Sequence, residues 1–294
     1  MWIGSPLRGG FRLVSYLLLT LVLLPLYLLS RALGVQSVVR WMPVVYHRVV
    51  CVILGIRVRV HGQRSDLIPT LYVCNHVSYL DIEVLGGLIP GSFVAKAEVA
   101  TWPFFRTLAK AQRTIFIERR SGKTSKSRDE MMNRLNTGDN LMLFPEGTSS
   151  DGTRVLPFRS ALFGVAQLRR NDKPITVQPV AISYTRLDGI PLGRYWRPLF
   201  AWFGDLDLVP HLWQMVCLGE TEAVVTFFPP VDIDRLGDRK KLAEFCFRQV
   251  SSAVQSANSG RLELLPPPSR AAPSRPRPGP LAMLETGRSS NGDR

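Results

Sequence analysis

Cysteine is scarce in this chain of 294 residues and is never closely spaced. The four thiols are those of Cys51, Cys74, Cys217 and Cys246. No two of them have the spacing of a zinc ligand set or of a thioredoxin-like motif. We therefore expect no metal site, and we expect ordinary buried, reduced thiols in a cytoplasmic body.

Two common active-site motifs are also missing. The chain has no Gly-x-Ser-x-Gly sequence, which argues against a serine nucleophile on a strained elbow. Gly122-Lys123-Thr124 resembles the end of a phosphate-binding loop, but Ile117 stands where that loop requires its first glycine. We therefore expect no nucleotide binding at Gly122-Lys123-Thr124.

Acidic residues are the minority among the charged side chains. There are 23 Asp and Glu against 37 Lys and Arg, so the net charge is +14. Such a surplus predicts an acidic partner, either nucleic acid or an anionic bilayer. The basic run from Arg113 to Arg128 has no interleaved series of aromatic side chains, so we expect no nucleic acid partner.

A long apolar run lies near the N-terminus. Leu13–Ser30 carries no charge and is at the short end of a membrane span. Arg31 lies where a secretory signal would be cleaved, which argues against a signal peptide. A second stretch, Trp41–Ile56, has His47 and Arg48 at its centre and is too polar to span easily. One span and two helices dipping into one leaflet both stay open.

Composition divides the chain into three segments. Residues 1–55 are expected to form membrane-anchoring helices, and residues 56–257 a single catalytic-sized domain. Residues 258–294 become rich in Pro, Ser and Arg and cannot bury enough apolar area to offset their ordering entropy, which predicts a disordered tail.

Within the domain, short apolar runs alternate with helical patterns, which predicts an α/β sandwich around a mostly buried mixed sheet. The expected strands are Ile56–His61, Thr70–Asn75, Ser92–Lys96, Thr114–Glu118, Asn140–Pro145, Thr176–Tyr184 and Glu222–Phe228. The expected helices are Tyr79–Gly86, Val99–Ala111, Ser125–Leu135, Arg159–Arg170 and Arg239–Ser256, the last capped by Asp238. The aromatic segment Tyr195–Leu218 fits either core helices with a loop or a surface resting in the membrane interface.

The first candidate catalytic block is Asn75-His76-Val77-Ser78-Tyr79-Leu80-Asp81. It follows a buried strand, and loops at strand ends often carry catalytic side chains. Residues five apart on a helix do not share a face, so His76 and Asp81 meet only if His76 precedes the helix. Ser78 as the N-cap would allow this, and Asp81 would then orient the imidazole as a base. Alone, the pair also fits an ordinary turn with Asp81 favouring the helix dipole.

Two further blocks carry polar groups at strand ends. Phe144-Pro145-Glu146-Gly147-Thr148 ends an apolar strand in a turn where Gly147 permits close approach of a ligand. Glu146 could bind a hydroxyl or an ammonium group. A second strand ends at Arg119, with Arg113 at its start, and a basic rim of this kind can bind phosphate or an acidic carrier.

These blocks, in this order, resemble the lysophospholipid acyltransferase family, which includes the 1-acylglycerol-3-phosphate acyltransferases. The matching stretches are His76 to Asp81, Phe116 to Arg119, Phe144 to Thr148, and Val177 to Ala181. The resemblance covers roughly residues 40–255, and four ordered blocks are together far more specific than any one of them.

The resemblance implies a mechanism and a set of partners. His76, held by Asp81, would remove the proton from a lysolipid hydroxyl, whose oxygen would attack the thioester of acyl carrier protein or coenzyme A. The implied ligands of the acceptor's head group are Arg119, Glu146, Gly147 and Thr148, with Arg113 as a further candidate. The family requires no cofactor and works at the bilayer, here implied to be the cytoplasmic face of a bacterial inner membrane.

Two positions depart from the family pattern. Ser149 stands where the third block commonly continues with Arg, and Arg113 stands where the second block commonly starts with Gly. Several stretches, including Ala95–Val99 and Val155–Phe158, look most similar to bacterial lyso-ornithine lipid acyltransferases. Those enzymes acylate the 3-hydroxyl of a fatty-acyl ornithine, whose head group is zwitterionic.

Other functions stay open at this point. Lysophosphatidate is a rival acceptor, and one enzyme could use both lipids. A protein of another class, a basic membrane-binding protein without catalytic activity, also accounts for the charge and the apolar N-terminus. It leaves the His76 and Glu146 blocks without a purpose.

Overall fold

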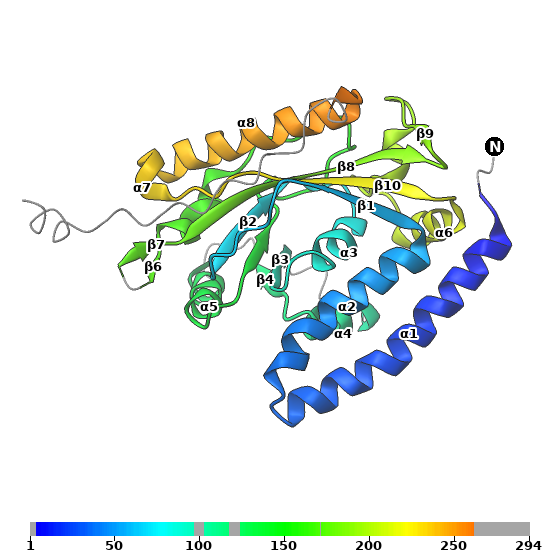
Figure 1. Ribbon diagram of the computed structural model, residues 1–294, viewed down its shortest axis with the longest axis horizontal. Coiled ribbons are helices and arrows are strands. Elements are labelled where there is room, and N and C mark those ends of the chain that lie inside the picture. The colour runs from blue at the N-terminus through cyan, green and yellow to red at the C-terminus, as the bar shows by residue number, and fades with distance from the viewer. Residues whose placement is uncertain (1–3, 97–102, 118–123, 171, 262–294) are drawn as a thin grey trace, which may run out of the picture.

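A computed structural model describes residues 4–96, 103–117, 124–170 and 172–261. It shows an α/β body with a hairpin of two long helices projecting from one side (Figure 1). The strands are β1 Ile56–His61, β2 Thr70–Cys74, β3 Ser92–Lys96, β4 Ile115–Ile117, β5 Leu141–Leu143, β6 Arg169–Arg170, β7 Lys173–Pro174, β8 Thr176–Leu187, β9 Ile190–Pro191 and β10 Thr221–Phe227.

The helices begin and end as follows: α1 Pro6–Ala32, α2 Gln36–Leu54, α3 Leu80–Gly86, α4 Pro103–Ala111, α5 Thr124–Asn136, α6 Leu208–Cys217, α7 Ile233–Leu236 and α8 Arg239–Asn258. Two 3-10 helices, η2 Ser160–Gln167 and η3 Arg197–Phe200, connect them. Asp238 caps α8 as expected, since its carboxylate accepts from the backbone N–H groups of Lys240 and Lys241.

The main sheet is mixed. Its order is β1-β10-β8-β2-β5-β3-β4, with β9 attached to β8. Neighbours pair in parallel except for β10 with β8 and β8 with β9, which are antiparallel. This confirms the predicted α/β class with a mixed sheet. The carboxyl ends of β2, β5 and β3 therefore lie side by side, and loops that leave neighbouring parallel strands meet at one edge.

Both faces of the sheet are covered by apolar side chains. In β2, Tyr72 and Cys74 face the cluster formed with α3 and α6, whereas Leu71 and Val73 face the cluster formed with α5, η2 and α8. This alternation is the period-2 geometry of a strand. In Figure 1, α8 lies over one face while α3 and the hairpin lie on the other side of the sheet.

The sequence predicted the seven main strands, with ends displaced by a few residues. The expected helix Arg159–Arg170 is wrong: the chain forms the 3-10 helix η2 and then the short hairpin β6–β7. The chain leaves the helical conformation at Leu168, whose backbone is extended, and passes directly into β6. Asp172 has a φ of 60°, which lets the chain turn back tightly.

The N-terminal helix is fastened to the body at its start. The guanidinium of Arg12 is buried and donates to the carbonyls of Val216, Leu218 and Gly219 at 3.3, 2.7 and 3.3 Å. These carbonyls lie in the last turn of helix α6 and just after it, where the backbone has few partners of its own. The Arg12 side chain therefore satisfies the end of α6 and fixes the direction in which α1 leaves the body.

Helix α1 has two contrasting faces. Its buried residues are Gly9, Arg12, Thr20 and Tyr27, which recur at helical spacing. The opposite side is a stripe of exposed apolar residues along the whole helix: Leu7, Phe11, Val14, Leu18, Leu21, Val22, Leu28 and Leu29. Both α1 and α2 are long and apolar enough to cross a membrane, by length and composition.

Replacement of Arg12 by Met tests the fastening of α1. The variant removes the Arg12 donor from the carbonyls of Val216 and Gly219, whereas that of Leu218 still accepts from Arg8, so we expect the free energy of unfolding to fall by about 2 kcal/mol. Arg31→Met is the matched control, because Arg31 is exposed in the last turn of the same helix. Denaturant unfolding in detergent micelles gives both values, and equal stability of the two variants would contradict this role of Arg12.

Candidate active site

The loop after β2 begins at Asn75, whose side-chain amide forms hydrogen bonds like those of a paired strand residue. Asn75 follows the last residue of β2, and its amide exchanges two hydrogen bonds of 2.9 Å with the backbone of Ile182 in β8. The side chain thus continues the strand pairing where the backbone of Asn75 turns away. The residue that follows, His76, is delivered to the edge of the sheet beside the end of β5.

His76 and Asp81 meet as the sequence predicts. The Nδ1 atom of His76 lies 2.8 Å from Oδ2 of Asp81, which is fully buried. The same Oδ2 accepts from the backbone N–H groups of Val77 and Ser78 at 2.7 and 3.0 Å. Because Asp81 offers an acceptor to Nδ1, that nitrogen carries the proton and Nε2 keeps its lone pair.

The other oxygen of Asp81 is held from the opposite side of the core. The hydroxyl of Tyr184 donates to Oδ1 at 2.9 Å. Burial and the neighbouring Asp81 charge raise the pKa of Tyr184 well above its ordinary value, so this hydroxyl stays protonated and remains a donor. Asp81 therefore accepts four hydrogen bonds, which stabilise its ionised form in a buried place.

The predicted role of Ser78 is wrong. Helix α3 has Tyr79 at its N-cap position without a side-chain cap, and the Ser78 hydroxyl is buried without a partner in the described structure. The Asp81 carboxylate takes the loop N–H groups instead, because a charged oxygen is the stronger acceptor. His76 still precedes the helix, so it can contact Asp81 in the first turn as the sequence predicts.

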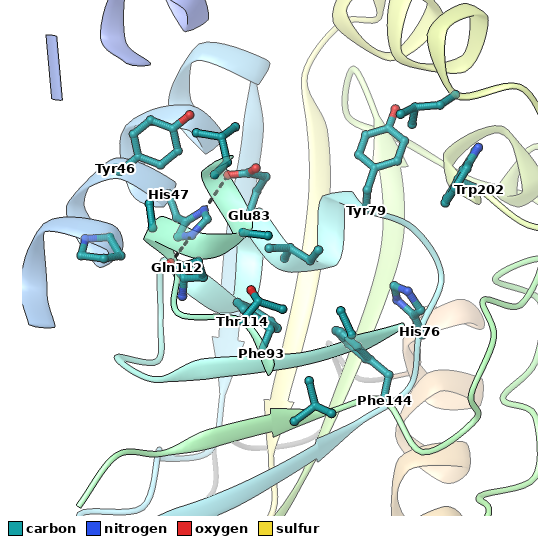
Figure 2. A pocket seen from close by; sticks show the side chains of 18 of the residues that line it. Tyr46, His47, His76, Tyr79, Glu83, Phe93, Gln112, Thr114, Phe144 and Trp202 are labelled. Carbon is teal, nitrogen blue, oxygen red and sulfur yellow. Dashed lines mark hydrogen bonds and ion pairs between the residues drawn. The ribbon is translucent and has the colours of Figure 1, made fainter. Parts of the chain in front are cut away.

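The imidazole is also held by an aromatic ring. His76 stacks on Phe144 with ring centroids 4.1 Å apart and an interplanar angle of 18°, and Phe93 stacks behind Phe144 at 6.2 Å. Figure 2 shows His76 and Phe144 together on one side of the pocket. About a quarter of the His76 side chain stays exposed, at 23%. The ring is thus fixed in direction while one edge remains open to the pocket.

Glu146 ties two loops together. Its Oε1 atom accepts from the N–H of His76 at 2.7 Å, and its Oε2 atom accepts from the N–H of Leu156 at 2.8 Å. The residue is only 2% exposed. Both oxygens are therefore engaged with the protein, and these contacts favour a positioning role for Glu146 over the expected contact with the head group.

The turn after Glu146 lines the pocket. Gly147 has a φ of 70°, which strains any residue with a Cβ, and a Cβ there would also crowd the Arg159 guanidinium at 3.1 Å, so both observations favour glycine. Gly147, Thr148 and Ser149 all border the cavity, in agreement with the expectation that this turn faces the substrate. Ser149, which replaces the family's arginine, donates its hydroxyl to the carbonyl of Trp202.

The two basic candidates have different outcomes. Arg113 makes a two-pronged ion pair with Asp139, at 2.7 and 3.2 Å, and is not among the residues that line the cavity. Its φ of 58° marks a tight turn after α4. These contacts favour a structural role for Arg113. Arg119 lies outside the described residues, so its expected role stays a prediction.

The cavity lies between the helical hairpin and the body, with a volume of about 550 Å³. Its walls come from α1 and α2, from α3 and β3, from the end of α4, and from the segment around Trp202. Within the described part of the chain, no group of three or more His, Cys, Asp and Glu side chains could hold a metal ion. A mainly apolar cavity with a base at one end suits a lipid substrate.

Several functional residues escaped the sequence argument. Tyr184 comes from β8, about a hundred positions from Asp81, and only the sheet order brings the two together. The stacking of Phe144 on His76 likewise depends on β2 and β5 being neighbours. The Asn75 amide was visible as the residue before His76, but its pairing with β8 required the strand register.

Comparison with known proteins agrees with this geometry. The family model described as "Acyltransferase" matches residues 57–183. The lyso-ornithine lipid O-acyltransferase of Brucella abortus is 45% identical over 76% of this chain and 85% of that protein. The 1-acyl-sn-glycerol-3-phosphate acyltransferase of Neisseria gonorrhoeae is 33% identical over 63% of this chain and 69% of that protein.

The fold has a solved counterpart. The crystal structure of the 1-acyl-sn-glycerophosphate (LPA) acyltransferase PlsC from Thermotoga maritima superimposes with a TM-score of 0.59, covering 85% of this chain and 94% of that chain. Sequence identity to it is 20%, so this likeness concerns the fold.

Replacement of Glu146 by Gln tests whether the buried carboxyl group is protonated, through the pH dependence of the free energy of unfolding. Burial raises the pKa of Glu146 to about 8, against the opposing effect of its two backbone hydrogen bonds. Between about pH 4.5 and pH 8 the unfolded chain has released a proton that the folded chain retains, so the free energy of unfolding falls as the pH rises. The contribution is at most about 1.4 kcal/mol per pH unit.

Glu146→Gln is neutral in both states and should lose this part of the slope. Denaturant unfolding from pH 5 to pH 8.5 gives the free energy of unfolding of both proteins. The other titrating groups contribute equally to both, so they cancel in the difference between the two free energies. We expect the variant to be less stable than the wild type at pH 5, with the gap narrowing toward pH 8. Parallel curves would show that Glu146 is ionised throughout.

Proposed function

The chain belongs to the acyltransferase family, and from that premise we propose that it moves a fatty acyl group from a thioester to the hydroxyl of lyso-ornithine lipid. The observation that carries the proposal is the His76–Asp81 pair, 2.8 Å apart, at the end of a lipid-sized cavity. The similarity to a lyso-ornithine lipid O-acyltransferase over most of both chains supports the choice of acceptor.

The proposed reaction uses His76 as a general base and then as a general acid. Nε2 takes the proton from the acceptor's hydroxyl as the oxygen attacks the thioester carbonyl. The tetrahedral intermediate collapses by breaking the carbon–sulfur bond, and the imidazolium returns the proton to the leaving thiolate. Asp81 keeps Nδ1 protonated throughout and stabilises the imidazolium, without itself taking up the proton.

The donor is proposed to be acyl carrier protein or coenzyme A. Both are anionic, and a net charge of +14 favours their approach at low salt. No enzyme nucleophile is needed, because the acceptor's own hydroxyl attacks. We propose no cofactor, in keeping with a reaction that has no redox step.

A second acceptor is favoured by a specific relative. The gonococcal protein named as a 1-acyl-sn-glycerol-3-phosphate acyltransferase is 33% identical to this chain. Lysophosphatidate is therefore the second candidate, either as the main acceptor or alongside lyso-ornithine lipid. Its head group is a phosphate, whereas the described lining of the cavity contains no Lys or Arg.

We propose that the helical hairpin lies along one leaflet, at the cytoplasmic face of the inner membrane. The hydroxyls of Thr20 and Tyr46 are 2.8 Å apart. From this level to the hairpin tip, α1 and α2 each extend only about 15–18 Å, which is short of a bilayer core of about 30 Å. The exposed apolar stripe of α1 also continues beside the body, as an in-plane helix requires. Arg31 and Arg40, near the tip, then lie at head-group level, which avoids the cost of charges at the bilayer centre.

Removal of the His76 imidazole tests the reaction. In a membrane assay with labelled acyl carrier protein, we expect His76→Ala to lower the rate of acyl transfer to lyso-ornithine lipid by about 10²–10⁴-fold. Asp81→Asn should lose a similar factor, since the wrong tautomer of His76 would be favoured. The unfolding midpoint of each variant shows whether the fold has survived.

The same assay offers lysophosphatidate beside lyso-ornithine lipid. His76-dependent transfer to lyso-ornithine lipid supports the proposal, and transfer to both lipids defines a dual-specificity enzyme. Transfer to lysophosphatidate alone would overturn the proposed acceptor. If neither lipid is acylated while binding to anionic vesicles persists, the non-catalytic membrane-binding function would replace it.

Cysteine labelling at the hairpin tip tests its position. Leu33→Cys places a thiol at an exposed site between α1 and α2, and the described native cysteines are all buried. In sealed vesicles of known orientation, we expect a membrane-impermeant maleimide to label this thiol from the side of the catalytic domain. Labelling only from the opposite side would mean that the hairpin crosses the bilayer. Leu218→Cys, buried in the body, is the unreactive control.

A further inference from the structure

A cluster of polar side chains occupies one end of the cavity. Figure 2 shows His47, Glu83 and Gln112 together, with His76 and Phe144 on the other side. All five border the same cavity. Helix α3 connects the two ends: Asp81 contacts His76, while Tyr79, Ile82 and Glu83 face the cavity at helical spacing. The cavity thus has a catalytic end and a polar end.

The contacts of His47 define its charge. Nδ1 lies 2.7 Å from Oε2 of Glu83, and Nε2 lies 2.9 Å from Oε1 of Gln112. Gln112 donates its own NH₂ group to the carbonyl of Gly91 at 3.1 Å, which fixes the direction of its amide. Both ring nitrogens therefore face acceptors, so His47 is an imidazolium paired with an ionised Glu83.

The fold is shaped to hold this ring. A Cβ at Gly86 would lie 2.5 Å from Cδ2 of His47, so glycine alone permits the ring to approach α3. The ring of Tyr46 packs edge-on against it, with centroids 5.5 Å apart. His47 serves as a fixed backing for Glu83, because its side chain is 7% exposed whereas that of Glu83 is 18% exposed.

The carboxylate of Glu83 faces the cavity more openly than its partner His47, whose side chain is the less exposed of the two. Among the described lining residues, Glu83 is the only acidic side chain, and none is Lys or Arg. Only Oε2 of Glu83 has a hydrogen-bond partner in the described structure, which leaves Oε1 for a ligand. A carboxylate with one oxygen turned to a cavity without Lys or Arg in its described lining complements a cation, and it does not complement a phosphate.

We propose that Glu83, backed by His47, binds the primary ammonium of the acceptor's head group and so sets the acceptor specificity. The inference rests on the proposed function and names the residues that recognise its substrate. In lyso-ornithine lipid the reacting hydroxyl and the side-chain ammonium are nine bonds apart, which spans about 10 Å when extended. Glu83 lies two residues after Asp81, the partner of His76, and both His76 and Glu83 border the cavity, so one extended molecule can present its hydroxyl to His76 and its ammonium to Glu83.

The pairing is chemically favourable for a zwitterion. The ammonium donates to Oε1 of Glu83 in a place shielded from water, where a charge-assisted hydrogen bond is strong. A phosphate head group would instead meet the Glu83 carboxylate, because both ring nitrogens of His47 are already engaged with Glu83 and Gln112 and none is left to bind a phosphate. This disfavours lysophosphatidate at this end.

The experiment compares two acceptors that differ in one group. The wild type is assayed with lyso-ornithine lipid and with its norleucine analogue, in which a methyl group replaces the ammonium. We expect the KM for the norleucine analogue to be about 10- to 100-fold higher. Glu83→Gln should raise the KM for lyso-ornithine lipid by a similar factor, leave the norleucine analogue nearly unchanged, and change kcat little.

Glu222→Gln is the matched control, because Glu222 is a buried glutamate paired with Arg59 and lies outside the cavity. It should keep the wild-type preference between the two acceptors. If the wild type uses both acceptors equally well, the inference is overturned. This comparison needs no variant, so it stays decisive even if Glu83→Gln does not fold. Equal losses on both acceptors in Glu83→Gln would also overturn it, and would indicate a structural role for the pair.

The two proposals fail in different ways. If the wild type acylates lysophosphatidate and ignores lyso-ornithine lipid, the proposed acceptor is wrong and the head-group site falls with it. If the wild type acylates lyso-ornithine lipid in a His76-dependent manner but shows no preference over the norleucine analogue, the proposed function stands and only the role of Glu83 is overturned.

Discussion

The active site depends on two buried carboxylates that are satisfied largely by the loop they hold. Asp81 accepts from the N–H groups of Val77 and Ser78, and Glu146 accepts from the N–H of His76. A buried carboxyl group without such partners would be strongly destabilising, whether ionised or neutral, so the loop can adopt few other conformations. The position of the imidazole therefore follows from the need to satisfy these two buried groups.

The sheet order decides why these groups meet. Strands β5 and β8 flank β2, so the Glu146 turn and Tyr184 reach the His76 loop from opposite sides. Phe144, at the end of β5, is brought under the imidazole by the same pairing. Each sequence block is weak evidence when taken alone. Because neighbouring parallel strands end at the same edge of the sheet, the blocks that follow them meet there and form one site.

The sequence allowed the strands, the α/β class and the His76–Asp81 pair to be predicted, because each leaves a local pattern: period-2 burial, alternation of elements, or fixed spacing. Contacts between distant segments could not be predicted. Nothing local shows that Glu146 binds backbone N–H groups or that His47 pairs with Glu83. The expected helix Arg159–Arg170 was wrong for a related reason, since η2 packs against α8 and no local pattern shows this contact.

In the proposed placement, helix α1 lies between the membrane and the cavity, because one of its faces is exposed and apolar while the other lines the cavity. The exposed stripe that includes Leu21 and Leu28 suits acyl chains, while Thr20 and Tyr27 on the other face border the cavity. In the proposed placement of α1 along one leaflet, a lysolipid in the same leaflet would have its polar part at the level of the cavity and its chain among lipids. Only the head group then has to leave the interface, so recognition by buried polar groups can decide the acceptor while the apolar chain stays solvated by the bilayer.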